Sequence, residues 1–527
     1  MRMIGSLPSF RFSRSPGLTF VAFLGVLCLA YVVAQLVLEG DIDTLVIGGM
    51  VFVGLAAVVA ILNDWRRGVY LLLTWIVLED LVRKYLGNNM AIFFGKDVIA
   101  LVVYLSFFIS KRAGRAKIFK PPFLLPLMLF LWYGVLQVLN PNSTSIFYGI
   151  LGMKIDFLYV PLLFVGYGFI ESDEDLRQFF AYNSVLVLIV VGLGITQSVL
   201  GHTFLNPAVL QSDIRDLSTT YRISPITGAI AYRPTSVFVS AGRLQNFLLI
   251  SWLVALGFGG YLLLRSRKNR LLAFLTVGVV GIGSIMSASR SVFLYTASSV
   301  LVVVVAFLWG SPWRQGEARR TVRAIMRGVV FAAVALFLMM TFLPEQTASR
   351  FAIYNETLSP DSPASELVHR ARDYPWRNFM LAFQHEHWPL GYGIGTCSLG
   401  IQYVARILHA PPMNIGVESG YGQLVVEMGV PGLLLWLLLS VSVSISAWKV
   451  VVKLKGTPWF PIGFVIFWYA FLLLIPITFY GFVAYQDFIM NAYLWILLGI
   501  LFRLPTLLRD EVQAQFIAQQ AVAARQA

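Results

Sequence analysis

Two carboxylates in the C-terminal part of the chain are the first candidates for chemistry. Glu418 stands directly before an apolar run that begins at residue 419, and Glu427 lies nine residues farther along that run. In a helix, this separation is about 13 Å along the axis. A carboxylate at that depth in a membrane is costly unless it is paired or hydrated, so we interpret Glu427 as a structural group at the helix break Gly429-Val-Pro-Gly432. Glu418, at the mouth of the helix, is the stronger candidate for a functional role.

Arginines in the polar segments are candidates for binding an anion. Arg290 lies in Ser287-Ala-Ser-Arg-Ser291, between two apolar runs. A guanidinium at this position can bind a pyrophosphate through two parallel hydrogen bonds, although a lone arginine at a membrane interface also serves as an anchor. Two interpretations, anion binding or a solvated loop surface, apply to Arg372, Arg377, Arg233 and Arg243.

Two further charged residues lie inside an apolar run. Lys154 and Asp156 are two positions apart, so they do not face each other on a helix. Two alternatives follow: Lys154 points into a central cavity, where it can bind a substrate, or each residue is satisfied by a neighbouring helix.

The sequence gives little support for a metal or a nucleotide. His385 and His387 have the spacing of a strand rather than a helix, and no third ligand is evident. We therefore expect no metal and no other cofactor. The P-loop, nucleophile-elbow and zinc-protease motifs are absent from the sequence. Any reaction must then use energy that is already stored in the substrate.

The amino-acid composition distinguishes a membrane protein from a water-soluble one. Hydrophobic residues make up 58% and charged residues 13% of the 527 residues, against roughly 25% charged residues in soluble globular proteins. The net charge of +14 comes from small basic clusters between apolar runs. This pattern is typical of the loops of a membrane protein. It excludes a water-soluble fold and disfavours nucleic acid as a partner.

With about 20 apolar residues needed for each spanning helix, the sequence predicts an all-α, polytopic transmembrane bundle of about 12–14 spans. The span at 68–79 is short and runs into Glu79, Asp80, Arg83 and Lys84, so we expect a half-helix or a segment partly in the interface. The candidate spans are 17–38, 44–62, 68–79, 91–110, 122–139, 147–169, 179–200, 244–264, 271–288, 291–309, 328–343, 419–447, 459–480 and 486–503.

The distribution of basic residues predicts the orientation. When the spans alternate, most of the 40 lysines and arginines fall on the side of the N-terminus, so both termini are predicted to be cytoplasmic. The chain then divides into spans 1–11 at 1–343, a large outer loop at 344–418, spans 12–14 at 419–503 and a cytoplasmic tail at 504–527. The loop has a helical composition at 370–384, and we expect it to contain short helices.

Several of these features together resemble the O-antigen ligase and O-antigen polymerase family of bacterial inner-membrane proteins. They are the Ser289-Arg290 hairpin, the turn Gly391-Tyr-Gly-Ile-Gly-Thr396 and the segment Glu418…Tyr421…Gln423…Glu427-Met-Gly429…Gly432. The large outer loop before the last few spans also matches, and the resemblance covers residues 230–450. Family ligases carry a His-Asn-x-Tyr-Leu motif where this chain has Glu418-Ser-Gly-Tyr-Gly.

The resemblance implies a membrane glycosyltransferase or polymerase in O-antigen or exopolysaccharide assembly. It would move a glycan from an undecaprenyl-diphosphate carrier to an acceptor hydroxyl at the periplasmic face, without a metal. Arg290 and Glu418 would be its catalytic residues. The residues that would contact the substrate are Arg372, Arg377, Arg233, Arg243, Lys154 and Tyr421. The implied partners are the lipid-linked glycan, an acceptor glycan or lipid, membrane lipids and other polysaccharide-assembly proteins.

Two alternatives belong to other functional classes. One is a transporter or flippase of lipid-linked glycan, which would share the cationic cavity but need no base. The large one-sided loop disfavours it, because alternating access favours balanced gates and internal repeats. The other is a non-catalytic scaffold within a polysaccharide-export complex.

Overall fold

The structure is a computed structural model that describes residues 42–86, 90–114, 116–207, 220–224, 227–265, 268–312, 334, 337–338, 340–358, 369–409 and 416–526. The chain divides into two compact units, 1–68 and 69–527. The first contains helix α2 (Ile42–Asn63) and the beginning of α3 (Trp65–Tyr85). The predicted span at 17–38 lies outside the described residues, as does most of the span at 328–343.

The described part of the second unit is mainly helical and contains one two-stranded antiparallel hairpin. Its first part comprises the rest of α3, then α4 (Met90–Arg112), α5 (Leu124–Val138), α6 (Ile146–Phe157), α7 (Leu162–Phe169), α8 (Asp173–Leu200), β1 (Tyr221–Ile223), β2 (Ile230–Tyr232), α11 (Ala241–Arg265), α12 (Arg270–Met286) and α13 (Arg290–Gly310). Its second part comprises α15 (Pro344–Leu358), η1 (His369–Asp373), α17 (Tyr374–Leu381), η2 (Ala382–Gln384), α18 (Ile401–Leu408), α19 (Gly420–Leu454), α20 (Phe460–Leu472), η3 (Leu473–Ile477), α21 (Thr478–Tyr480), α22 (Val483–Gln486) and α23 (Phe488–Gln526).

These helices confirm the predicted all-α, multi-pass class. Within the described residues, eight helices are long and apolar enough to cross a membrane, and three shorter apolar helices accompany them. The long ones coincide with predicted spans, including 147–169, where α6, α7 and the turn between them form a stretch of 24 residues. Helix boundaries follow local chemistry. For example, Ser172 and Asp175 form a reciprocal capping box at the start of α8, and Gly201 ends that helix with a φ of 92°.

Helix α3 extends beyond the predicted span at 68–79 and continues to Tyr85 as one helix of 21 residues. The four charged residues at its C-terminal end are all buried within the protein: Glu79, Asp80, Arg83 and Lys84. Glu79 pairs with Lys96 of α4 and Asp80 with Arg243 of α11, so two of these charges have partners on other helices. Since α3 is not among the eight helices that are long and apolar enough to cross a membrane, its place in the membrane stays a prediction.

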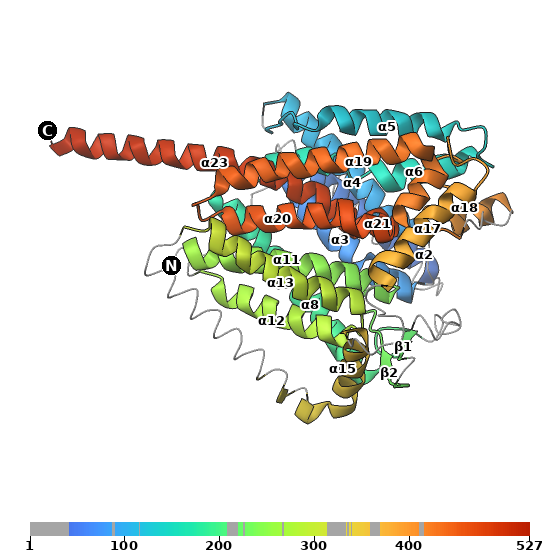
Figure 1. The fold of residues 1–527 in the computed structure, drawn as a ribbon. Coiled ribbons are helices and arrows are strands. Elements are labelled where there is room, and N and C mark those ends of the chain that lie inside the picture. Colours follow the sequence, from blue (N-terminus) through green and yellow to red (C-terminus); the bar gives the residue numbers. More distant parts are fainter. Residues whose placement is uncertain are drawn as a thin grey trace. The chain divides into compact units, whose positions relative to one another are not determined.

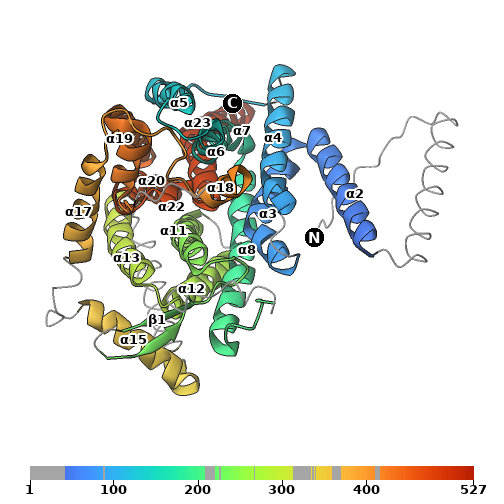
Figure 2. The ribbon, with the colours of Figure 1, turned by 90° about the vertical axis from the view of Figure 1, so that its right-hand side faces the viewer.

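The elements that do not span the bundle gather at one end of the second unit. Figure 1 shows β1, β2, α15, α17 and α18 together at its right-hand side, and Figure 2 looks onto that end. The predicted loop at 344–418 contributes α15, η1, α17, η2 and α18, so its short helices are confirmed. The helical composition at 370–384 corresponds to η1, α17 and η2.

The glycine-rich turn at 391–396 packs between two helices. Tyr392 N donates to Val426 O at 2.8 Å and Gly393 N donates to Glu427 O at 2.9 Å, so the turn hydrogen-bonds to α19. On its other side, Gly395 has a φ of 89° and lies against Gly152 of α6. A Cβ atom on Gly152 would come within 2.6 Å of Gly395 N. The turn can approach α6 this closely only because neither residue has a side chain.

This close approach predicts that Gly152→Ala destabilises the protein. The new methyl group would meet the backbone of the turn, and overpacking of this kind typically costs about 1–3 kcal/mol. Thermal unfolding in detergent should show a lower Tm. Gly259→Ala in α11 is the matched control, because no atom lies within 4 Å of the Cβ position there. An equal Tm for both variants would contradict the tight packing of the turn.

Candidate functional site

A cavity of about 1050 Å³ opens among the helix ends, and β1, α17 and α18 each contribute to its lining. It is lined by the C-terminal end of α3, by the N-terminal ends of α4, α11, α13 and α23, and by part of α6. Its volume is at the upper limit for small-molecule sites. Among the described residues, its walls contain two carboxylates, Asp97 and Asp487, and seven basic residues: Arg83, Lys96, Lys154, Arg222, Arg233, Arg243 and Arg290. This excess of basic residues favours an anionic ligand.

Half of the predicted site residues meet in this cavity. Arg290, Arg233, Arg243 and Lys154 come from four separate parts of the sequence, and all four line it. Burial also lowers the pKa of Arg233, because desolvation disfavours the charged guanidinium. An anion in the cavity would offset part of that cost.

Arg290 is held at the start of α13 by the element α15. The helix begins with Ser289, whose Oγ accepts a hydrogen bond from Val292 N at 3.4 Å. Arg290 itself is only 8% exposed, and its Nη2 lies 3.6 Å from Glu356 Oε1 of α15. Glu356 also accepts a hydrogen bond from Ser224, at the end of β1. One carboxylate therefore connects α13, α15 and the hairpin.

Arg350 strengthens the same connection from inside α15. It is 1% exposed, and its Nε donates to Met286 O at 3.0 Å while its Nη2 donates to Tyr232 O at 3.1 Å. These bonds tie the end of α12 to β2. Helix α15 thus fixes the positions of both the α12–α13 turn, which carries Arg290, and the hairpin, which carries Arg222 and leads to Arg233.

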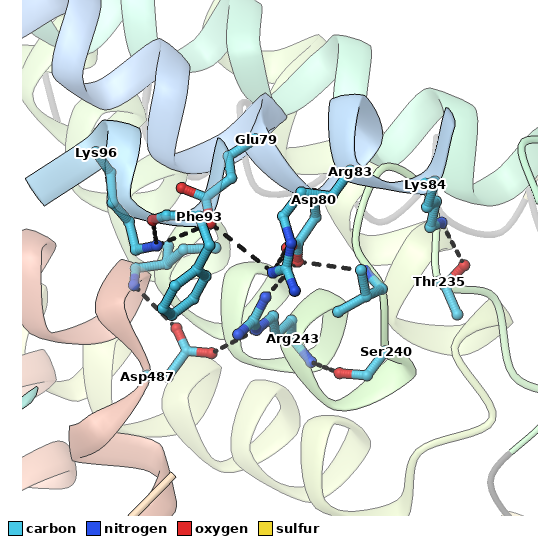
Figure 3. Close-up of polar contacts among 12 residues, drawn as sticks. Glu79, Asp80, Arg83, Lys84, Phe93, Lys96, Thr235, Ser240, Arg243 and Asp487 are labelled. Carbon is cyan, nitrogen blue, oxygen red and sulfur yellow. Dashed lines mark hydrogen bonds and ion pairs between the residues drawn. The ribbon is translucent and has the colours of Figure 1, made fainter. Parts of the chain in front are cut away.

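Arg243 lies between two carboxylates from distant parts of the chain (Figure 3). Its Nη1 is 2.5 Å from Asp80 Oδ2 of α3, and its Nε is 3.8 Å from Asp487 Oδ2 at the start of α23. Asp80 also pairs with Arg83 at 3.0 Å. Since all of these groups are largely buried, the pairs hold α3, α11 and α23 together at the cavity wall.

Lys96 forms the other buried pair of this network. Its Nζ lies 2.8 Å from Glu79 Oε1, and the two side chains are 2% and 0% exposed. Phe93 is near three cations, with Lys96 Nζ at 3.3 Å, Lys154 Nζ at 4.5 Å and Arg83 Cζ at 5.0 Å from the ring centre. The ring face is attractive to cations, so Phe93 helps to hold several like charges close together.

Lys154 lines the cavity and is also paired with a neighbouring helix, so both alternatives describe it. Its Nζ lies 2.7 Å from Asp97 Oδ2 of α4. Asp156 does not share this contact, as its spacing predicted. It is fully buried, and its Oδ1 accepts a hydrogen bond from Gln486 Nε2 at 3.4 Å.

The other predicted residues do not line the cavity. Glu418 is exposed and accepts a hydrogen bond from Tyr374, which does line it, so Glu418 lies one side chain away from the wall. Tyr421 donates to Ile475 O at 3.2 Å, between α19 and η3. Two arginines are exposed on η1 and α17: Arg372, which pairs with Asp373 at 2.7 Å, and Arg377.

Glu427 is buried and hydrogen-bonded, and its partners differ from the helix break that we expected. Its Oε1 accepts hydrogen bonds from Cys397 N at 2.7 Å and Ser398 Oγ at 3.0 Å. It therefore binds the segment after the glycine-rich turn rather than capping the break in its own helix. The break is real, since Gly429 has a φ of 68°, and Val430 N beyond it donates to Pro389 O at 3.2 Å.

His385 and His387 both lie beside the ring of Tyr392, with ring centres 6.4 and 4.9 Å away. In the parts of the chain that the structure describes, no three side chains of His, Cys, Asp or Glu are grouped so that they could hold a metal ion.

The sequence reasoning missed several residues of the cavity wall. Arg222, Arg83, Lys96, Asp97 and Asp487 all line it. A signal for two of them was present: Lys96 and Asp97 are adjacent charges inside the apolar run 91–110. Charges within a membrane span are expensive and usually functional.

Loss of one partner from the Lys96–Glu79 pair is predicted to destabilise the protein. Lys96→Met would leave Glu79 buried with only the more distant Arg83, whose Nη1 lies 4.0 Å from Glu79 Oε1, and removing one partner of a buried pair typically costs about 3–5 kcal/mol. Thermal unfolding of the purified protein should show the loss. The control is the double variant Lys96→Met, Glu79→Gln, which should regain stability because no charge is left behind. A single variant as stable as the unmodified protein would refute the role of this pair.

Comparison with known proteins adds no assignment: no protein-family model matches this chain, and no curated protein matches it at a significant level.

Proposed function

We propose that this protein is a membrane glycosyltransferase or polymerase that moves a glycan from an undecaprenyl-diphosphate carrier to an acceptor hydroxyl. The observation that carries the proposal is the cavity at the helix ends, with seven basic and two acidic residues among its described lining residues. A diphosphate is the part of such a donor that needs several cations. The resemblance of residues 230–450 to the O-antigen ligase and polymerase family supports the same reaction.

The cavity offers both of the environments that a lipid-linked donor requires. Arg290, Arg233 and Arg243 provide guanidinium groups for the phosphate oxygens. Apolar side chains of neighbouring helices, among them Leu249 and Leu294, line the same cavity and suit the beginning of a prenyl chain. The arginines would stabilise the negative charge that develops on the diphosphate as its bond to the sugar breaks.

Fixed cations suit this task because their positions are already set. Arg290 is held through Glu356, and Arg243 is held between Asp80 and Asp487. Charges that need not reorganise during the reaction stabilise a transition state most effectively. In this proposal, Glu418 lies at the rim and orients the acceptor hydroxyl or takes its proton, with Tyr374 connecting it to the cavity wall.

The proposed location is the bacterial inner membrane, with the cavity on the periplasmic side and both termini in the cytoplasm. The helix ends that line the cavity agree with a location on one side of the membrane. They are the C-terminal end of α3 and the N-terminal ends of α4, α11, α13 and α23. These are the ends that the alternation of spans assigns to the outer face.

The orientation predicts which cysteines an impermeant thiol reagent reaches. In a background of Cys28→Ser and Cys397→Ser, Glu386→Cys should be labelled from the periplasm, whereas Arg112→Cys should be labelled only after lysis. Both positions are exposed, so access to the compartment decides the result. Labelling of Arg112→Cys in intact spheroplasts would reverse the orientation and remove the periplasmic reaction.

Arg290 should be needed for both donor binding and turnover. Arg290→Ala removes a charge-assisted contact of about 1.5–3 kcal/mol, so the Kd for undecaprenyl diphosphate in nanodiscs should rise by about 10- to 100-fold. Arg290→Lys should restore part of the affinity, because an ammonium cannot form the forked contact. Arg112→Ala is the control, since its exposed side chain lies at the other end of α4.

Turnover is measured as undecaprenyl diphosphate released from a lipid-linked oligosaccharide. Unchanged binding in Arg290→Ala would contradict the assignment of the diphosphate to this cavity. Tight binding with no release under any acceptor condition would instead favour a transporter or flippase.

A further inference from the structure

Four aromatic side chains form a continuous strip on the segment that precedes the glycine-rich turn. Trp376 and Phe379 of α17, Phe383 of η2 and then Trp388 follow one another, with ring centres 5.6, 5.2 and 5.5 Å apart. Trp376 is 56% exposed and Trp388 is 37% exposed. Contiguous exposed apolar surface of this kind marks an interaction site. We call these four residues the aromatic strip.

Helix α17 packs on α19 through one side only. Its buried residues are Pro375 and Asn378, and Asn378 Oδ1 accepts a hydrogen bond from Glu418 N at 3.4 Å, next to the start of α19. Trp376 and Met380 lie on the opposite side of the helix and are exposed. Figure 2 shows α17 at the edge of the second unit, beside α19. The strip therefore faces away from the bundle.

The far end of α19 has the chemistry of a membrane interface. Trp448 stacks on Trp309 of α13 with ring centres 5.7 Å apart, and both rings are exposed. Lys455 Nζ lies 4.0 Å from the ring centre of Trp309, and Lys449 and Lys453 are exposed nearby. Tryptophans beside lysines are typical of the level at which the hydrocarbon of a bilayer ends.

An exposed apolar face of α19 leads from that level to the strip. It consists of Leu434, Leu438, Val441 and Ile445. Gly429 stands 19 positions before Trp448, which is about 28 Å along a helix. The hydrocarbon core of a bilayer is roughly 30 Å thick. The second edge of the hydrocarbon is therefore expected near Gly429.

The Trp388 end of the strip packs at this second edge. Pro389 O accepts a hydrogen bond from Val430 N at 3.2 Å, and a Cβ atom on Gly429 would come within 2.6 Å of Leu390 Cα. Leu390, directly beside the strip, is 62% exposed. From there the strip runs outward along the first turns of α19, through the layer that lipid headgroups occupy.

We propose that the aromatic strip rests on the membrane surface, with its indoles among the lipid headgroups at the cavity end of the bundle. Amphipathic indole rings favour this layer because one side of it is apolar and the other is wet. The exposed apolar face of α19 continues directly into the strip, so one bilayer covers both.

The charges beside the strip indicate which lipids it prefers. Arg377 of α17 and Arg372 of η1 are exposed, and Arg372 also pairs with Asp373. Basic residues next to an interfacial aromatic surface attract anionic headgroups. The partner that fits is thus a bilayer containing an anionic lipid such as phosphatidylglycerol, and the two arginines bind lipid rather than the donor.

This contact sets the height of the cavity. Tyr374, the first residue of α17, lines the cavity and binds Glu418, so the element that rests on the headgroups also carries part of the cavity wall. The diphosphate of a lipid-linked donor lies at the same level. It can enter the cavity while its prenyl chain stays in the hydrocarbon. Only this step rests on the proposed glycan transfer.

The test measures depth in the bilayer with nitroxide labels on the full chain in nanodiscs. In the background Cys28→Ser, Cys397→Ser, labels are attached at Met380→Cys and Leu390→Cys, two exposed positions that leave the strip intact. Collisions with oxygen report lipid, and collisions with a water-soluble nickel chelate report water. Leu438→Cys is the control within the hydrocarbon, and Gln519→Cys, exposed in the C-terminal tail, is the control in water.

Both test labels should show an oxygen-to-nickel ratio several-fold above that of Gln519→Cys, with Leu390→Cys closer to Leu438→Cys. Ratios equal to that of Gln519→Cys would overturn the proposal. Spectra broadened by a neighbouring label, and sharpened on dilution with unlabelled protein, would show that a second copy of the chain covers the strip, which would also overturn it.

The lipid preference has its own readout. The ratio at Met380→Cys should be higher in discs of phosphatidylglycerol than in discs of phosphatidylcholine, and the double variant Arg372→Gln, Arg377→Gln should abolish this difference. Arg112→Gln, exposed at the other end of α4, is the matched control and should retain it. Equal ratios in the two lipids, or a difference that survives the double variant, would refute the role of the two arginines.

Failure of this inference and failure of the proposed function give different results. Labels in contact with lipid, in a protein that never releases undecaprenyl diphosphate from a lipid-linked oligosaccharide, would support the membrane contact and contradict the transfer. Labels in water, in a protein that does release it, would overturn the membrane contact alone.

Discussion

Arg243 is bound by Asp80 and Asp487, and this contact joins three helices that are far apart in the sequence. A charge within an apolar bundle has no water to compensate it, so it must find a partner inside the protein. Once Arg243 has both carboxylates, the C-terminal end of α3 and the N-terminal ends of α11 and α23 are fixed beside one another. The cavity occupies the space among these ends, and its other basic residues depend on the same arrangement.

Much of the helical architecture could be predicted because each span carries its own signal. Apolar runs of sufficient length predicted the long helices with small errors at their ends. The exception, α3, shows the limit of that signal. Its charged end looks like a polar segment when read alone, yet it is helical and buried, and Arg243 and Lys96 are the partners of its carboxylates. The identity of those partners depends on packing between residues that are distant in the sequence, which a one-dimensional pattern does not contain.

The same limit explains which residues of the cavity wall were found. Arg290, Arg233 and Arg243 were conspicuous because each is a basic residue near the predicted outer face. Glu418 was chosen from its place in a resembling motif, yet the structure places it beside the cavity rather than in its wall. Asp97 was overlooked although a charge inside an apolar run is itself a signal. Composition shows that such a residue is unusual, but only the contact with Lys154 shows what it faces.

The buried pairs also bear on the choice between a transferase and a transporter. Alternating access requires helices around a binding site to separate on one side and then on the other. Here, the pairs Arg243–Asp80, Arg243–Asp487 and Lys96–Glu79 hold α3, α4, α11 and α23 together beside the cavity. Separating them would leave charges without partners in a poorly hydrated space, and losing one partner of such a pair typically costs about 3–5 kcal/mol. A cavity whose walls are held in this way favours a fixed reaction site over a moving gate, because the charges proposed to bind the ligand also hold the helices in place.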